Sequence, residues 1–207
     1  MSQQKGVTSP PAPVPAAPPA AEPRDPWQNV ITRHGFPADQ VISALQKEVR
    51  RGNTENAMLL AYEMATSSAE LENKLWQRLR VISVEDVGFG DPQAPILLHT
   101  LHQFRKDFDY SDGEPLLFVT HAVRYLCAAE KDRGTDEMII WTKQVVEEQG
   151  RRPVIPDYAL DMHTRQGKAM GRGMLHFMEQ ATVLNPELLP RDKSYRDKIM
   201  ASLDNTT

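Results

Sequence analysis

Basic residues and glycines gather in one stretch near the C-terminal end of the sequence. From Asp157 to Gly173 the chain carries three glycines, three basic residues and a histidine. The basic residues are three and four positions apart, so on a helix they would form one positive stripe, and the glycines would let a phosphate come close. Such a stripe favours sequence-independent phosphate contacts with nucleic acid, whereas the alternative is a solvated face that pairs with Asp157 and Asp161. The predicted phosphate-binding residues are Arg151, Arg152, His163, Arg165, Lys168 and Arg172.

Other arrangements that could do chemistry are incomplete. The sequence has no phosphate-binding loop, because Gly167-Lys168 is followed by alanine rather than a hydroxyl residue and no strand is expected before it. His99 and His102 are one helical turn apart and could ligate a metal, but spacing places no third ligand. Cys127 lies in an apolar run without a base beside it, as expected of a small buried side chain. We therefore predict no catalytic residue, no metal and no cofactor.

A second charged stretch, residues 78–94, has the pattern of a junction between two helices. Apolar residues at three- and four-residue steps before it share one helical face. Gly88 can end that helix in the left-handed conformation, and Asp91 can cap the next helix with Pro92 at its first position. The predicted face consists of Leu71, Leu75, Leu79 and Ile82.

Two carboxylates of this junction are expected to need a partner. Glu85 and Asp86 would lie in the last turn of the first helix, where the helix dipole disfavours negative charge. We expect Arg78 or Arg80, about one turn earlier, or a partner chain to hold them. The predicted junction residues are thus Arg78, Arg80, Glu85, Asp86, Gly88, Asp91 and Pro92.

The same acidic pair leaves an enzymatic interpretation open. In that alternative, His163, Arg165 and Lys168 act with Glu85 and Asp86 on a phosphorylated or nucleic-acid substrate. It requires a cleft that brings the acidic pair to the basic stretch, so distances between these groups decide between the two interpretations.

Hydrophobic periodicity is helical almost throughout from residue 37 onward. Val41, Leu45 and Val49 mark a first helix that ends at Gly52, and five further segments with the same periodicity follow up to Gly150. A short helix is expected near residues 192–203. No stretch alternates with period two, so residues 27–207 are predicted to form a compact, all-α, multi-helix domain. Residues 1–26 are rich in proline and alanine and are predicted to be a disordered or polyproline-like tail.

Composition is consistent with this organisation. The 207 residues suit one domain with a tail, and the net charge of −4 requires any nucleic-acid contact to come from a local basic patch. The single cysteine cannot form an internal disulfide, and no apolar run approaches the roughly 18 residues that span a bilayer. The N-terminal residues lack the pattern of a secretory signal. We therefore expect a cytoplasmic protein without a membrane segment.

Three segments resemble, in the same order, those of the replication-associated recombination ATPases, the bacterial RarA/MgsA proteins and the eukaryotic Werner-helicase-interacting ATPase. Residues 78–94 are similar to the family's R-L-x-R-I-A-S-E-D-V-G-x-A-D-P-x-A segment. Residues 44–53 resemble L-H-K-S-I-R-G-S-D, with one extra residue before the glycine. Residues 155–173 are similar to I-P-x-H-L-R-D-A-H-x-x-G-x-x-L-G-x-G. The resemblance covers roughly residues 40 to 175.

This resemblance implies the helical region that follows the AAA+ ATPase core, which in those proteins mediates tetramer assembly in a machine acting on DNA at stalled replication forks. The ATPase core itself is not found in these residues, so ATP hydrolysis is not expected. The predicted function is a non-enzymatic helical oligomerisation and interaction domain associated with DNA replication or repair. Its expected partners are further copies of itself and, through a weak sequence-independent face, DNA or a replication or repair protein.

Overall fold

A computed structural model describes residues 25–204 of the chain, and residues 1–24 and 205–207 lie outside the described part. The predicted tail therefore falls outside it as far as residue 24, and Pro26 already begins a short 3-10 helix, η1 (Pro26–Asn29). Residues 25–204 form helices joined by loops and contain no strand. One isolated β-bridge joins Ile31 and Pro37. The all-α prediction is confirmed. The described chain divides into two compact units, one ending at Thr142 and the other starting at Lys143.

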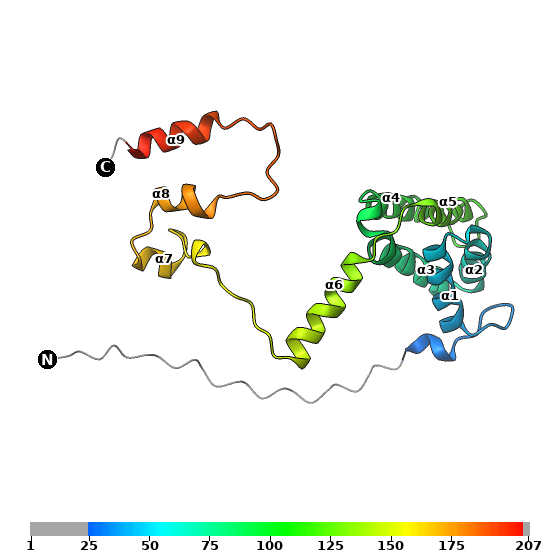
Figure 1. The fold of residues 1–207 in the computed structure, drawn as a ribbon. Coiled ribbons are helices and arrows are strands. Elements are labelled where there is room, and N and C mark those ends of the chain that lie inside the picture. The colour runs from blue at the N-terminus through cyan, green and yellow to red at the C-terminus, as the bar shows by residue number, and fades with distance from the viewer. Residues whose placement is uncertain (1–24, 205–207) are drawn as a thin grey trace. The chain divides into compact units, whose positions relative to one another are not determined.

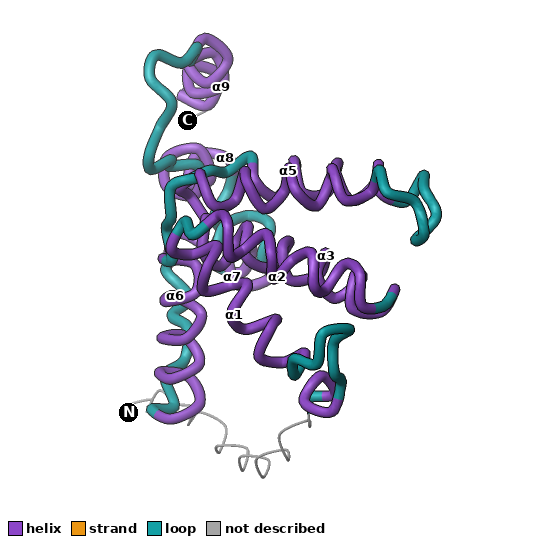
Figure 2. Tube along the Cα trace, turned by 90° about the vertical axis from the view of Figure 1, so that its right-hand side faces the viewer, coloured by secondary structure: helices purple, strands orange, loops and turns teal. Residues whose placement is uncertain are grey.

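The first unit is a helical bundle with one projecting helix (Figure 1). Its helices are α1 (Ala38–Arg51), α2 (Thr54–Ser67), α3 (Ala69–Ile82), α4 (Ala94–Arg105), α5 (Pro115–Ala128) and α6 (Gly134–Lys143). Between α3 and α4 lie a π turn, η2 (Ser83–Val87), and a 3-10 turn, η3 (Gly88–Gly90). Helices α1 to α5 lie side by side, whereas α6 extends beyond their ends (Figures 1 and 2).

The core of the bundle is built from the apolar faces that the sequence predicts. Leu71, Leu75, Leu79 and Ile82 of α3 are fully buried together with Leu45 of α1. Full burial of such side chains contributes about 1.5–3 kcal/mol each before conformational entropy is counted. The helix ends follow local chemistry as well, because Gly52 has a φ of 73° and ends α1, and the Ser68 hydroxyl accepts the Leu71 N–H at 3.2 Å.

The second unit consists of short elements joined by extended segments. They are η4 (Gln144–Glu148), η5 (Asp157–Ala159), α7 (Arg165–Ala169), α8 (Met174–His176), η6 (Phe177–Ala181) and α9 (Ser194–Asp204). Helix α9 confirms the short helix predicted near residues 192–203. Among the residues of this unit that the structure describes, Val145 and Met178 are the buried apolar side chains. Within residues 25–204, no helix is long and apolar enough to span a lipid bilayer.

Candidate functional site

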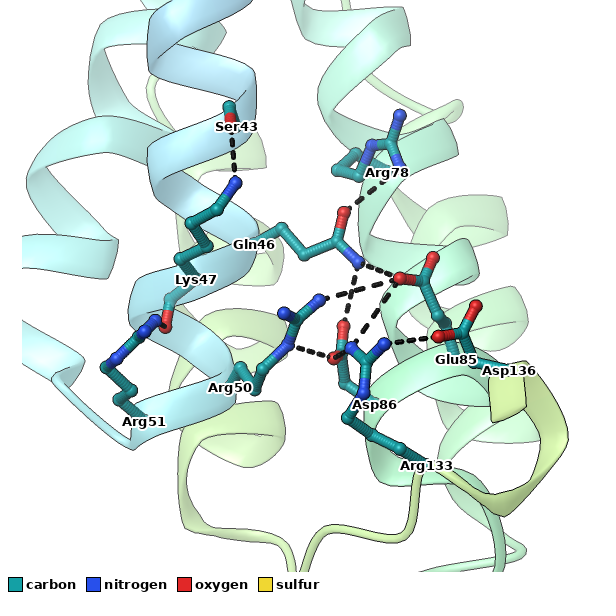
Figure 3. A network of polar contacts seen from close by, with 10 residues as sticks. All are labelled: Ser43, Gln46, Lys47, Arg50, Arg51, Arg78, Glu85, Asp86, Arg133 and Asp136. Atoms are coloured by element: carbon teal, nitrogen blue, oxygen red, sulfur yellow. Dashed lines mark hydrogen bonds and ion pairs between the residues drawn. The ribbon is translucent and has the colours of Figure 1, made fainter. Parts of the chain in front are cut away.

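The two carboxylates of the junction are held by residues from two distant parts of the first unit (Figure 3). Asp86 is fully buried, and its Oδ1 accepts from Arg50 Nε of α1 and, at 2.9 Å, from Arg133 Nη1. Its Oδ2 accepts from Gln46 Nε2 at 2.9 Å. Glu85 shares these partners, with Gln46 Nε2 at 2.6 Å, Arg50 Nη2 at 3.5 Å and Arg133 Nη1 at 3.8 Å. The network ties α1, the π turn and the segment before α6 together.

The expectation that Arg78 or Arg80 holds the acidic pair is wrong. Arg78 Nη1 donates to Gln46 Oε1 at 3.1 Å, and Arg80 Nε donates to the Trp76 carbonyl oxygen at 3.3 Å. The chain enters the wider π turn of η2 after α3, which changes the direction in which the following side chains leave the helix. The carboxylates therefore contact side chains of α1 and Arg133 rather than arginines of the preceding turn of α3.

Two glycines bring the start of the α6 segment against this network. Gly88 has a φ of 53°, as a glycine-specific helix end requires, but its ψ of −130° is not the left-handed helical value that we predicted. A Cβ at Gly88 would overlap the Asp132 carbonyl oxygen, and one at Gly90 would lie 2.5 Å from the Glu130 carbonyl oxygen. The Asp132 N–H donates to the carbonyl oxygens of Asp86 and Val87, both at 3.1 Å. The two glycines thus allow the backbone of residues 130–132 to contact the backbone of the junction directly.

The predicted start of the following helix is also corrected. Helix α4 begins at Ala94, and Pro95 rather than Pro92 occupies its first turn. Asp91 accepts the Gln93 N–H at 3.0 Å and so closes the turn before the helix instead of capping the helix itself. The hydroxyl of Tyr125 donates to the other Asp91 oxygen, which raises the pKa of Tyr125 and links this turn to α5.

The basic stretch does not form the continuous stripe that its spacing predicts. Helix α7 is short, and Gly171, with a φ of 71°, lies between it and Arg172. Arg172 Nη2 binds both carboxylate oxygens of Asp157 at 2.7 Å, and its Nη1 binds the carbonyl oxygens of Asp157 at 2.6 Å and Leu160 at 2.9 Å. Arg172 therefore holds the loop before α7, which agrees with the alternative of internal pairing with Asp157.

His163 has a similar internal role. Its backbone N–H donates to Asp161 at 2.9 Å, its Nδ1 lies 3.1 Å from the other Asp161 oxygen, and its ring packs edge-on against Phe177 at 5.0 Å. These hydrogen bonds lower the pKa of Asp161. Gly167 is buried against the Asp161 backbone, so its lack of a side chain serves this loop rather than an incoming phosphate.

Two cations of the basic stretch remain directed to solvent. Arg165 and Lys168 lie on α7 and are exposed, and within residues 25–204 neither side chain forms a hydrogen bond or an ion pair. Arg152 Nη1 donates to the neighbouring Arg151 carbonyl oxygen at 3.2 Å. The exposed positive charge is therefore centred on one turn of α7.

The histidine pair considered for metal binding has another environment. The His102 ring stacks on Trp76 with a centroid distance of 5.0 Å. Burial, with a smaller contribution from Arg80, lowers the pKa of His102 to about 4, so this imidazole is neutral at pH 7. No cluster of three or more His, Cys, Asp or Glu side chains that could hold a metal occurs in the described range.

The sequence predicts the helix that contains α6, but it does not predict the exposure of this helix. In contrast to α1 to α5, it buries no residue, and Met138 and Ile140 are 68% and 57% exposed. Ile139 and Trp141 are exposed as well. A signal was present in the sequence, because four consecutive apolar residues cover every side of a helix, whereas a helix packed on a core needs one apolar face.

Comparison with known proteins decides the family. The family model described as MgsA AAA+ ATPase C terminal matches residues 52–197, which contain α2 to α8 and the start of α9. The chain belongs to this family. Replication-associated recombination protein A of Bacillus subtilis (strain 168) is 28% identical over 139 residues, which are 65% of this chain and 31% of that protein. The chain thus spans about a third of its relative's length, and the resemblance inferred from the three segments is confirmed.

Proposed function

We propose that this MgsA C-terminal domain is a self-assembling, non-enzymatic module of the machinery of DNA replication and repair. Family membership and the name of the Bacillus subtilis relative support the association with replication. The enzymatic alternative has less support, since the oxygens of Glu85 and Asp86 already accept hydrogen bonds from Gln46, Arg50 and Arg133. Carboxylates engaged in this way are poor candidates for acid–base work.

The observation that carries the proposal is the exposed apolar surface of α6. Four neighbouring apolar side chains on a helix without buried residues form a contiguous patch, and such patches on soluble domains mark contact sites. Each square ångström of apolar surface removed from water contributes roughly 25 cal/mol, so covering this helix with a further chain is favourable. Copies of the same chain are available to cover this surface. In an assembly with closed symmetry, every copy has its apolar surface covered.

Replacing Met138, Ile139 and Ile140 with glutamine is expected to abolish self-association. Glutamine keeps good helix propensity and length but removes the apolar surface, and because the three side chains are exposed the melting temperature should stay within a few degrees. Light scattering reports the mass of the particle. The matched control is Ile96→Gln with Leu117→Gln, which removes exposed apolar residues from α4 and α5. Unchanged assembly of the α6 variant would rule out this helix as the contact.

A second proposed activity is weak, sequence-independent contact with DNA. Arg165 and Lys168 support it, because they lie three residues apart on α7, are exposed and carry charge that no group within residues 25–204 neutralises. Lysine and arginine in this situation can approach phosphates and release counterions. Arg151 and Arg152 precede them in the chain and would add to the field, whereas Arg172 and His163 are engaged in the loop.

The double change Arg165→Gln and Lys168→Gln should reduce the slope of log affinity against log salt by about two units, one for each lost phosphate contact. Fluorescence anisotropy with a labelled duplex measures this slope at several salt concentrations. The control Lys47→Gln with Arg124→Gln removes the same charge from the first unit and should leave the slope nearly unchanged. Equal slopes for parent and α7 variant would show that these cations do not touch DNA.

A further inference from the structure

A groove runs along the surface of the bundle between α1, α2 and the loop that precedes α1. It has a volume of about 540 Å³ and is lined mainly by apolar side chains. The core side of α2 carries small residues such as Ala57 and Ala61, so the larger apolar side chains of α2 are left on the groove side. The apolar residues that line the groove are Phe36, Val41, Ala44, Leu59, Leu60 and Tyr62.

The chemistry of this groove fits an extended, proline-rich segment. Phe36 and Tyr62 place two aromatic rings in the lining, and these residues are 55% and 43% exposed. Aromatic-lined grooves are common receptors for the polyproline II conformation, whose carbonyl groups form no internal hydrogen bonds. The side-chain amide of Gln40 and the hydroxyl of Tyr62 have no hydrogen-bond partner within residues 25–204, so they can donate to such carbonyl groups.

The chain carries such a segment just before the part that the structure describes. Residues 1–24 lie outside the described part, and they contain a P-x-x-P spacing at residues 10–13 and another at residues 15–18. The described chain starts at the N-terminal end of α1, because the Val30 carbonyl oxygen, directly after η1, accepts the Ala38 N–H at 2.9 Å (Figure 1). The groove also begins at this end of α1.

The lengths of the segment and of the groove agree. Pro18 precedes Asp25 by seven positions, which span about 22 Å at 3.1 Å per residue in the polyproline II conformation. A helix with its side chains is about 10–12 Å across, so the segment can pass the end of α1 and enter the groove. Along α2 the lining runs from Asn56 to Glu63, about 10 Å, which matches the four residues of one P-x-x-P unit.

Charge favours the same occupant. Glu48 and Glu55 line the hollow that continues the groove toward the α1–α2 turn, and neither pairs with a cation in the described part of the chain. Burial tends to raise the pKa of Glu63 at the other end, but hydrogen bonds from the preceding loop outweigh it and lower the pKa, so this carboxylate is negative at pH 7. An acidic segment would be repelled, whereas Lys5 is the one charged side chain of residues 1–21.

We propose that residues 10–19 bind the α1–α2 groove of the same molecule in the polyproline II conformation. Residues 15–18 occupy the apolar part of the groove, and the preceding residues run toward Glu48 and Glu55, with Lys5 beyond them. Because proline fixes φ, ordering this segment costs less conformational entropy than ordering most sequences. The chain thereby covers its own groove, which opens to another proline-rich protein when the segment leaves. The inference depends neither on self-assembly nor on DNA contact.

The labelling rate of a cysteine placed in the groove tests this proposal in the full chain. Ala44→Cys adds one sulfur atom at a half-buried lining position, and excess N-ethylmaleimide, a neutral reagent, reports access to that sulfur. The native Cys127 is buried, and burial raises its pKa, so its thiol reacts slowly. The matched tail variant replaces the six prolines of residues 10–19 with serine, which keeps length and charge.

We expect the groove cysteine to react at least about threefold faster with the serine tail than with the native tail. A short connection gives an effective concentration on the order of 1 mM, so that even weak binding occupies the groove about two-thirds of the time. The groove variant Leu59→Ala/Tyr62→Ala removes exposed apolar walls, and on that background the two tails should give equal rates. A reporter outside the groove, Leu117→Cys on α5, should also react equally with either tail.

The outcomes decide whether the segment binds and to which molecule. Equal rates for the two tails at Ala44→Cys overturn the proposal, and so does a difference that persists in the groove variant. Protection that rises between roughly 1 and 100 µM protein would show that the tail of a second copy is the occupant, which also contradicts it. Protection that is independent of protein concentration and is lost with either the serine tail or the groove variant is the predicted result.

Discussion

Replacement of Asp86 with asparagine is expected to lower the free energy of unfolding of the first unit by about 3 kcal/mol. Asp86 is fully buried and is the shared acceptor of Arg50, Arg133 and Gln46. Asparagine has nearly the same volume, but it lacks the negative charge, and its amide NH2 group would face the N–H donors of the arginines and Gln46. We take the low end of the range for a broken buried pair because the side chains of Arg50 and Arg133 are 29% and 31% exposed and can regain water.

Thermal unfolding followed by circular dichroism measures this effect, and a loss of that size lowers the melting temperature by roughly 10 °C. Glu85→Gln is the internal control, since Glu85 meets the same arginines at 3.5 and 3.8 Å and keeps a quarter of its side chain exposed. We expect it to lose less than about 1 kcal/mol. Equal losses for the two variants would contradict the central position of Asp86 in the network.

Replacement of Gly88 with alanine is expected to destabilise the first unit by about 3 kcal/mol, from two causes that add. The positive φ costs an alanine about 1 kcal/mol or more, and the new Cβ overlaps the Asp132 carbonyl oxygen, so the backbone contact between η2 and the segment before α6 must open. Chemical denaturation gives the free energy of unfolding directly.

Gly113 supplies the matched control for this change. It has no atom within 4 Å of an added Cβ and lies in an exposed loop, so Gly113→Ala should change stability by less than about 1 kcal/mol, in either direction. If Gly88→Ala were as stable as Gly113→Ala, segment 130–132 would not be in contact with the junction.

The sequence predicts the features that depend on residues close together in the chain, and it does not predict contacts between residues far apart in the chain. The buried face of α3 and the end of α1 at Gly52 were predicted correctly, because each depends on residues within about one helical turn of one another. The partners of Glu85 and Asp86 were not predicted, because Arg50 and Arg133 are more than 30 residues away in the chain. Spacing reveals neighbours on one helix but not across a bundle.

The basic stretch shows a second reason for failure. Spacing places Arg172 on the face of Arg165 and Lys168 only if one helix continues through Gly171, and that glycine takes a positive φ instead. The exposed surface of α6 was overlooked for a different reason, since hydrophobic residues at helical spacing were assigned to the core. Whether an apolar helix is buried within its own chain depends on the tertiary arrangement, which periodicity alone does not contain.

Self-association is the central claim, and the mass of the unmodified chain in solution tests it most directly. Light scattering coupled to size exclusion should be run from roughly 1 to 100 µM, since association follows mass action. We predict a weight-average mass that rises with concentration to a whole multiple of the 23.4 kDa chain, starting with two. A mass of 23.4 kDa across the whole range would contradict the account, because the apolar surface of α6 would then remain in water.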